Sequence, residues 1–275
     1  MPIWFNYSPL AAGITRYVDD GKRDLCKATV SIVDVGDFEV ALVGTGTSVE
    51  LIRVATLNSD GKLTPTQSET VSKLMDHMIS VLRITYDQGV ARLSWNDQTI
   101  SMGAHDKDGQ PNLSIDISDV TPPRDNYDFE NVARVFAGST KIRHLMKLLS
   151  DTQLFSLPLQ YRYLSLYKIF ELEFKFGGKW DGLDALLAPY QEQYGALKVS
   201  DRALRNIIHE LRDKCAHIKT GSNDDLGIVG LDHADTNIVS ALMPLLIKII
   251  ANYISEKHAH LKIIVSEPPV ASRTA

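Results

Sequence analysis

Two kinds of hydrophobic pattern divide the chain, with strand-like runs in roughly the first 120 residues and helical spacing after them. The strand-like runs are rich in Val, Ile and Thr and are bounded by Gly or Asp, at residues 27–35, 39–43 and 48–57. Shorter strands are predicted farther along, at residues 90–95, 99–102 and 113–117. In residues 65–86 apolar side chains recur on one stripe, which predicts a helix. We therefore expect a small α+β domain, a sheet with at least one helix packed on it.

The pattern changes at Pro122–Pro123, because a proline pair resists both helix and sheet. After it, we expect a helix capped by Asp128 or Asn126 that Gly138–Ser139 breaks or bends. The predicted parts of the chain are an α+β domain, a helical domain and a disordered tail, at residues 1–122, 126–265 and 266–275.

Most of the second domain is predicted to be a four-helix bundle, since four helical patterns follow one another with short connections. These patterns cover residues 158–176, 180–194, 200–219 and 237–257. Gly177–Gly178 should end the first of these helices. Ser200 is the expected N-cap of the third helix, and Gly221 should close it. A polar loop at residues 223–235 precedes the last helix.

The composition is ordinary for a globular protein. The chain has 275 residues, of which 44% are hydrophobic, and a net charge of −5. The two cysteines lie far apart in sequence, which favours a reducing, cytoplasmic setting. The first residues lack the features of a signal peptide. The most apolar segment, residues 238–254, contains Pro244 and Lys248 and is interpreted as a buried helix. We therefore expect no membrane partner.

Several motifs that suggest a cofactor or metal are incomplete. Gly44-Thr45-Gly46 begins like a dinucleotide loop, but Val49 stands in place of the third glycine. Asp106 and Asp108 resemble the start of a calcium loop that lacks flanking helices and a matching acid at its twelfth position. The histidines have no cysteine or carboxylate partners at metal-ligand spacing. The sequence predicts no metal site and no cofactor.

One motif carries candidate chemistry, in the helix predicted at residues 200–219. Arg212 is followed by Asp213 and, five positions after the arginine, by His217. This spacing resembles the arginine–histidine motif of the HEPN superfamily, which closes one helix of a four-helix bundle. The resemblance implies a metal-independent RNA endonuclease with two motifs facing each other across a homodimer. It also implies that Glu171 matches an inner-face glutamate of the first bundle helix, although pairing with Lys168 or Lys175 on the surface explains it equally well. The whole chain also loosely resembles methylamine-utilisation accessory proteins.

The residue types fit RNA cleavage without metal. A histidine moves protons near neutral pH, and a guanidinium holds phosphate oxygens while staying charged. We predict catalytic roles for Arg212, His217 and Asp213. Because residues five apart differ by about 140° on a helix, the pair converges only if the helix frays or a second copy contributes. Between residues 198 and 219, six Lys and Arg outnumber three acids, and the predicted substrate-binding residues are Arg205, Lys214 and Lys219.

The resemblance to the HEPN superfamily thus implies a metal-independent RNA endonuclease in a toxin–antitoxin or antiviral system. Its expected partners are RNA, a second copy docked through the helix 200–219 and the last helix, and a protein such as an antitoxin. The alternative is a non-catalytic HEPN-like module that dimerises or binds another protein, which the negative net charge favours. An unremarkable solvated helix end at Arg212 and His217 is compatible with that alternative.

Overall fold

The computed structural model describes residues 3–9, 23–45, 48–57, 63–85, 100–104, 128–154, 157–216, 218–219, 228–229, 231–258, 261 and 263. The chain divides into two compact units, Met1–Arg143 and His144–Ala275. The first contains an antiparallel sheet with helices and the second is mostly helical, so the fold is mixed α+β.

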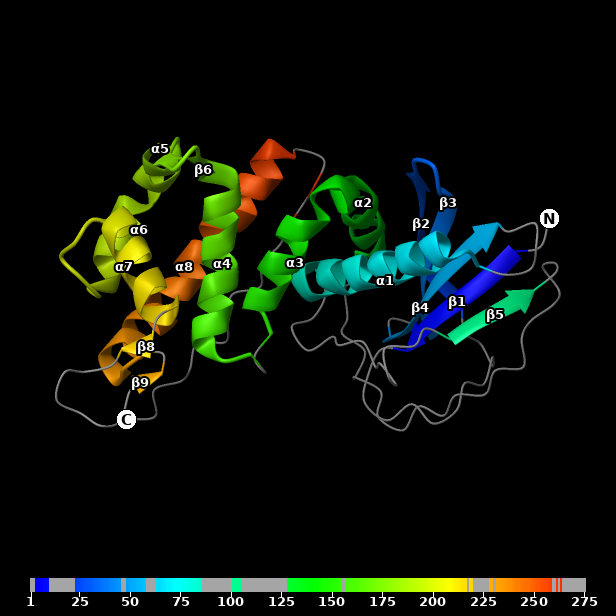
Figure 1. The fold of residues 1–275 in the computed structure, drawn as a ribbon, viewed down its shortest axis with the longest axis horizontal. Helices are drawn as coiled ribbons and strands as arrows, with labels where there is room; N and C mark the ends of the chain where they lie inside the picture. The colour runs from blue at the N-terminus through cyan, green and yellow to red at the C-terminus, as the bar shows by residue number, and fades with distance from the viewer. Residues whose placement is uncertain are drawn as a thin grey trace. The chain divides into compact units, whose positions relative to one another are not determined.

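The first unit is built on a five-stranded sheet with the order β2-β3-β4-β1-β5 (Figure 1). Its strands are β1 (Ile3–Pro9), β2 (Arg23–Ile32), β3 (Gly36–Thr45), β4 (Ser48–Leu57) and β5 (Ile100–Ala104). All neighbouring strands run antiparallel. The first strand in sequence is therefore an inner strand, and Ile3 lies opposite both Leu57 of β4 and Ala104 of β5.

Three of these strands follow the β-branched runs. The prediction at residues 48–57 matches β4, and β3 extends the prediction at 39–43 at both ends. The predicted strand 27–35 is wrong at its end, because β2 stops at Ile32 and a turn follows. Asp34 in this turn has φ 63°, a left-handed value that ends the extended strand, and Gly36 with φ 129° begins β3. Strand β1 was not predicted, and residues 90–95, 113–117 and 120–126 lie outside the described part of the chain.

Helix α1 (Pro65–Thr85) confirms the helix predicted at residues 65–86, and its apolar stripe is buried. It contacts β4 and helix α2 (Phe129–Ser139), which in turn contacts β2. The Asp128 carboxylate accepts from the Asn131 backbone N–H at 2.9 Å, so Asp128 is the N-cap. The sequence starts the second domain at residue 126, but the contacts of α2 place it with the sheet, and the division falls after Arg143.

A buried histidine joins α1 to α2. His77 is 3% exposed, and its Nε2 lies 3.1 Å from both the Phe136 carbonyl oxygen and the Ser139 hydroxyl. The Ser139 hydroxyl also donates to the Val135 carbonyl. Burial lowers the pKa of His77 to about 4, although the bond to Phe136 acts in the opposite direction. At neutral pH this imidazole is uncharged, so it can lie in the core beside the Phe136 ring.

The helix breaks at Gly138–Ser139, as predicted. Helix α2 ends at Ser139, a 3-10 turn (η1, Thr140–Ile142) follows, and helix α3 (Arg143–Thr152) leads into the second unit. That unit continues with α4 (Leu159–Phe174), α5 (Leu183–Leu187), η2 (Ala188–Tyr190), α6 (Gln191–Leu197), α7 (Leu204–Ala216) and α8 (His233–Lys257). The single helix predicted at 180–194 is wrong, because Pro189 falls at the 3-10 turn between α5 and α6.

A tight hairpin follows α4. Strand β6 (Lys175–Phe176) pairs with β7 (Lys179–Trp180), and Lys175 lies opposite Trp180. Gly177 and Gly178 have φ of 54° and 80°, the backbone that a two-residue hairpin turn requires. The glycines do follow the end of the helix, but they also turn the chain back and bring Trp180 toward α4 and α7.

The last helix, α8, is long and apolar enough to cross a membrane by length and composition alone. Of its most apolar window, 56% is buried inside the protein. Helix α8 contacts α4, α5 and α6, and the Asp232 carboxylate caps its first turn by accepting from the Asp235 N–H at 2.7 Å. These contacts are those of a core helix, as expected for residues 238–254.

Candidate functional site

The candidate site lies on α7, which packs against α4 through a buried apolar stripe. Its buried residues are Leu204, Ile207, Ile208, Leu211 and Cys215. The helix starts at Leu204, so the prediction of Ser200 as its N-cap is wrong. The Ser200 hydroxyl instead accepts from the Arg202 backbone N–H at 3.1 Å, which makes a local turn before the helix. Gly221, the predicted closing residue, lies outside the described part of the chain.

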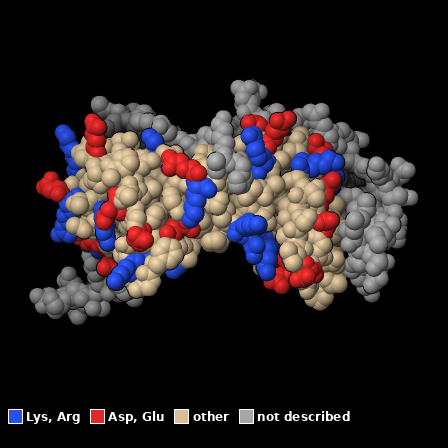
Figure 2. All heavy atoms as spheres, turned by 90° about the horizontal axis from the view of Figure 1, so that it is seen from above, with Lys and Arg blue, Asp and Glu red and all other residues tan. Residues whose placement is uncertain are grey.

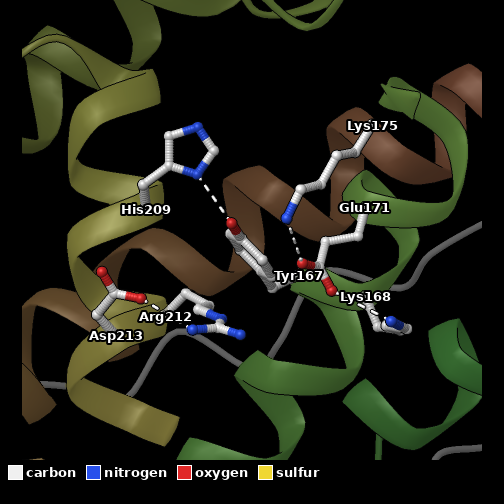
Figure 3. A network of polar contacts seen from close by, with 7 residues as sticks. All are labelled: Tyr167, Lys168, Glu171, Lys175, His209, Arg212 and Asp213. Atoms are coloured by element: carbon white, nitrogen blue, oxygen red, sulfur yellow. Dashed lines mark hydrogen bonds and ion pairs between the residues drawn. The ribbon is translucent and has the colours of Figure 1, made fainter. Parts of the chain in front are cut away.

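Arg212 lies on the side of α7 that faces Tyr167 of α4 (Figure 3). Its guanidinium carbon is 5.8 Å from the centre of the Tyr167 ring, within the range of a cation–π contact. Its Nη1 donates to the Asp213 carboxylate at 3.0 Å. The Arg212 side chain keeps 34% of its surface exposed. The Arg212 guanidinium is thus held from two directions, while part of the side chain's surface stays exposed.

His217 lies outside the described residues. Helix α7 ends at Ala216, and strand β8 (Ile218–Lys219) pairs with β9 (Ile228–Val229). Lys219 is in β8 opposite Ile228.

Two other predicted substrate-binding residues hold carboxylates of the protein itself. Lys214 Nζ donates to Asp235 of α8 at 2.6 Å and lies 3.1 Å from Glu210. The hydrogen bond to Asp235 raises the pKa of Lys214. Arg205 pairs with Asp184 of α5. The structure therefore gives both residues a role in joining α7 to its neighbours. On the face drawn in Figure 2, basic and acidic side chains are mixed.

A cluster that the sequence did not predict lies beside Arg212. The Tyr167 hydroxyl is 2.9 Å from His209 Nδ1, and the Trp180 ring lies 4.6 Å from the His209 ring and 5.8 Å from the Tyr167 ring, between centres. His209, Arg212 and Asp213 are three and four residues apart, so one face of α7 carries them all. That spacing is visible in the sequence, but Tyr167 is 42 residues away and only the tertiary fold brings it there.

The environment of this cluster keeps both of its titratable groups neutral near pH 7. Burial lowers the pKa of His209, and the positive charge of Arg205 lowers it further. Burial raises the pKa of Tyr167 to about 12, and the Glu171 carboxylate adds to this rise. His209 Nε2 is buried and has no hydrogen-bond partner among the described residues. Burial thus disfavours the protonated form of His209.

Glu171 pairs with both neighbouring lysines, at 3.2 Å to Lys168 and 3.4 Å to Lys175. Burial alone would raise the pKa of Glu171, but the hydrogen bonds from the two lysines outweigh it and hold the pKa below its usual value. The surface ion pair explains Glu171 without a catalytic role. Lys175 also lies 5.6 Å from the centre of the Trp180 ring.

Within the described ranges, no group of three or more His, Cys, Asp or Glu side chains is placed to hold a metal ion. No protein-family model, curated protein or solved structure matches the chain.

Proposed function

We propose that the chain is a metal-independent RNA endonuclease in which Arg212 and His217 act on the scissile phosphate. The observation that carries the proposal is the arrangement of Arg212, whose guanidinium is held by Tyr167 and Asp213 while 34% of the side-chain surface remains exposed. A guanidinium in this state offers planar donors to phosphate oxygens with little reorganisation. Helices α4, α5, α6, α7 and α8 would then form the HEPN-like bundle that the motif belongs to.

The reaction needs no cofactor. The ribose 2′-oxygen loses its proton to a base and attacks the adjacent phosphorus. The bond from phosphorus to the 5′-oxygen breaks, and an acid protonates that oxygen. Arg212 stabilises the charge on the non-bridging oxygens, Asp213 orients Arg212, and His217 carries the proton. The products have a 2′,3′-cyclic phosphate and a free 5′-hydroxyl.

A homodimer completes this site, because one histidine cannot take up one proton and deliver another in the same step. Two motifs facing each other supply a base and an acid. We propose that α7 and α8 contribute to this interface. Light scattering over micromolar concentrations should give about twice the chain mass of 30.6 kDa. A monomer throughout that range would contradict a shared site.

RNA cleavage in the presence of EDTA is the direct test. The wild-type chain should cleave mixed RNA and leave cyclic phosphate ends. Arg212→Ala should lower the rate by a factor on the order of 10²–10³, the loss expected when one donor to a developing oxyanion is removed. His217→Ala should abolish cleavage. Arg202→Ala is the matched control, because Arg202 is also a basic residue beside α7 but pairs with Glu210, and its rate should not change. Cleavage that stops on chelation, or that survives in His217→Ala, contradicts the mechanism.

The second candidate function is a non-catalytic module that dimerises or binds a partner protein. The observation in its favour is that Lys214 and Arg205 are both occupied by carboxylates, which leaves less positive charge for a phosphate backbone. In this case the wild-type chain cleaves no RNA under any of these conditions. Arg212→Ala then affects only partner or dimer affinity.

A further inference from the structure

Helix α4 presents two tyrosines to α7, one turn apart. The Tyr163 hydroxyl donates to the backbone carbonyl of Ile208 at 2.8 Å, and the Tyr167 hydroxyl lies 2.9 Å from His209 Nδ1. Tyr163 is 1% exposed and its contact ends inside the core. Tyr167 differs because its ring also lies 5.8 Å from the Arg212 guanidinium (Figure 3). Two similar hydrogen bonds between the same helices therefore have different surroundings.

The direction of the Tyr167–His209 bond follows from the protonation states. Tyr167 keeps its proton, because burial raises its pKa to about 12. His209 is neutral, because burial lowers its pKa. A protonated phenol donates to the free lone pair of a neutral imidazole, so Nδ1 accepts and Nε2 carries the hydrogen. The hydroxyl of Tyr167 is thereby tied to a ring that Trp180 packs against at 4.6 Å.

We propose that Tyr167 and His209 are positioning residues for Arg212, and that the hydrogen bond between them fixes the aromatic face on which the guanidinium rests. The inference rests on the proposed function in one respect, that Arg212 is the phosphate-binding group. Trp180 and the β6–β7 hairpin hold His209, His209 holds the Tyr167 hydroxyl, and the Tyr167 ring holds Arg212. Asp213 fixes the guanidinium from its edge.

Such a device has a clear physical purpose. A free arginine side chain loses rotamer entropy when it is immobilised. If that entropy is lost during folding, it is not lost when the phosphate binds, and the donors already point where charge develops. Asp213 alone does not achieve this, because its side chain is 68% exposed and a pair in water is weak. The buried ring below the guanidinium supplies the constraint.

The first arm of the test measures Arg212 itself and does not depend on activity. The ¹⁵N–¹H signal of Arg212 Nε is assigned by its loss in Arg212→Lys, and its exchange with solvent is compared among full-length variants. Tyr167→Phe keeps the ring but removes the hydroxyl, and it should speed exchange about fivefold, the factor that one net hydrogen bond gives. Tyr163→Phe is the matched control and should leave the signal unchanged. His209→Leu should reproduce the effect of Tyr167→Phe, whereas His209→Asn, whose amide oxygen can accept from Tyr167, should restore most of the protection.

The second arm measures RNA cleavage in EDTA with the same variants. Tyr167→Phe should lower kcat about fivefold with little change in KM, and Tyr163→Phe should change neither. Equal effects of Tyr163→Phe and Tyr167→Phe on Arg212 exchange, or no effect of either, would overturn the positioning role. If the wild-type chain cleaves no RNA, the proposed function fails, while the exchange measurements still decide whether Tyr167 and His209 hold Arg212.

Discussion

His77 in the first unit and His209 in the second are chemically alike but are placed differently. Burial lowers the pKa of each, and each has one ring nitrogen that is buried without a hydrogen-bond partner among the described residues. His77 bonds to a backbone carbonyl and to the Ser139 hydroxyl, both inside the core. His209 bonds to Tyr167, which contacts the partly exposed Arg212.

The difference shows that a histidine whose pKa is lowered is not by itself a sign of a functional site. The contacts of His77 end within the packed α1–α2 pair, so they stabilise the fold and reach no ligand-accessible group. The contacts of His209 continue to a charged group that a ligand can reach. The two histidines differ in the group that their chain of contacts reaches, and they do not differ in the direction of their pKa shifts.

Truncating the two histidines should separate them most strongly. His77→Ala should lower the free energy of unfolding by about 3–4 kcal/mol, because it leaves a cavity and removes the contacts to Phe136 and Ser139. His209→Ala should cost about 1–2 kcal/mol, since His209 is only partly buried. Hydrogen exchange of the α1 and α7 backbone amides, read by mass spectrometry, assigns each loss to its unit. A larger loss in α7 than in α1 would contradict the comparison.

The pH dependence of stability should come mainly from His77. Its folded pKa of about 4 lies below its ordinary value of 6.5, so the unfolded chain binds more protons between these values. The stabilisation is complete above pH 6.5 and is lost as the pH falls toward 4, by about 3 kcal/mol at 1.36 kcal/mol per pKa unit. Urea unfolding monitored by circular dichroism at several pH values measures this slope. His77→Gln does not titrate and should flatten it; an unchanged slope would place the titration elsewhere.

Lys214 is a basic residue on α7, and its substitution tests whether its role is structural, as for His77, or ligand-binding, as proposed for Arg212. Lys214→Met should lower the free energy of unfolding by about 1–2 kcal/mol, because Asp235 loses a charged partner in a nearly buried position. The KM for RNA and its salt dependence should stay as in the wild type. Thermal unfolding and salt titrations of cleavage check both parts. A raised KM with normal stability would instead make Lys214 a phosphate contact.

The smallest expected effect is in the β6–β7 hairpin, which carries Trp180 to His209. Gly178→Ala should cost about 1 kcal/mol, because φ is 80° and an L-residue is strained there. A new Cβ meets nothing within 4 Å, so no clash adds to this cost. Gly195→Ala in α6 is the control, also in open space but at a helical position, and it should be neutral or stabilising. Thermal denaturation compares the two, and equal shifts would argue against a strained turn.

Sequence patterns predicted the elements whose signals are local. The apolar stripe of α1, the β-branched run of β4 and the Asp128 cap each depend on residues within one element. The Gly177–Gly178 pair was interpreted as a helix end, because a two-residue turn shows only when its two strands pair.

For the candidate site, the spacing in the sequence indicates Arg212 and Asp213, but His209 belongs to no motif. Its partner is Tyr167, 42 residues earlier, and no periodicity links them. His217 stays a prediction. Local signals therefore predicted the helix and its charged end, and the tertiary contacts of α4 with α7 revealed what supports Arg212.

The position of β1 between β4 and β5 bears on how the chain is made. During synthesis β1 emerges first, but its neighbours are about 50 and 100 residues farther along, as the pairs of Ile3 with Leu57 and Ala104 show. Strands β2, β3 and β4 follow one another closely in sequence and can pair as soon as they leave the ribosome. We expect this meander to form early and β1 to dock on the edge of β4, which leaves the other edge of β1 open until β5 has been made. The nascent chain is therefore most exposed to edge-to-edge aggregation before residue 104 has been translated.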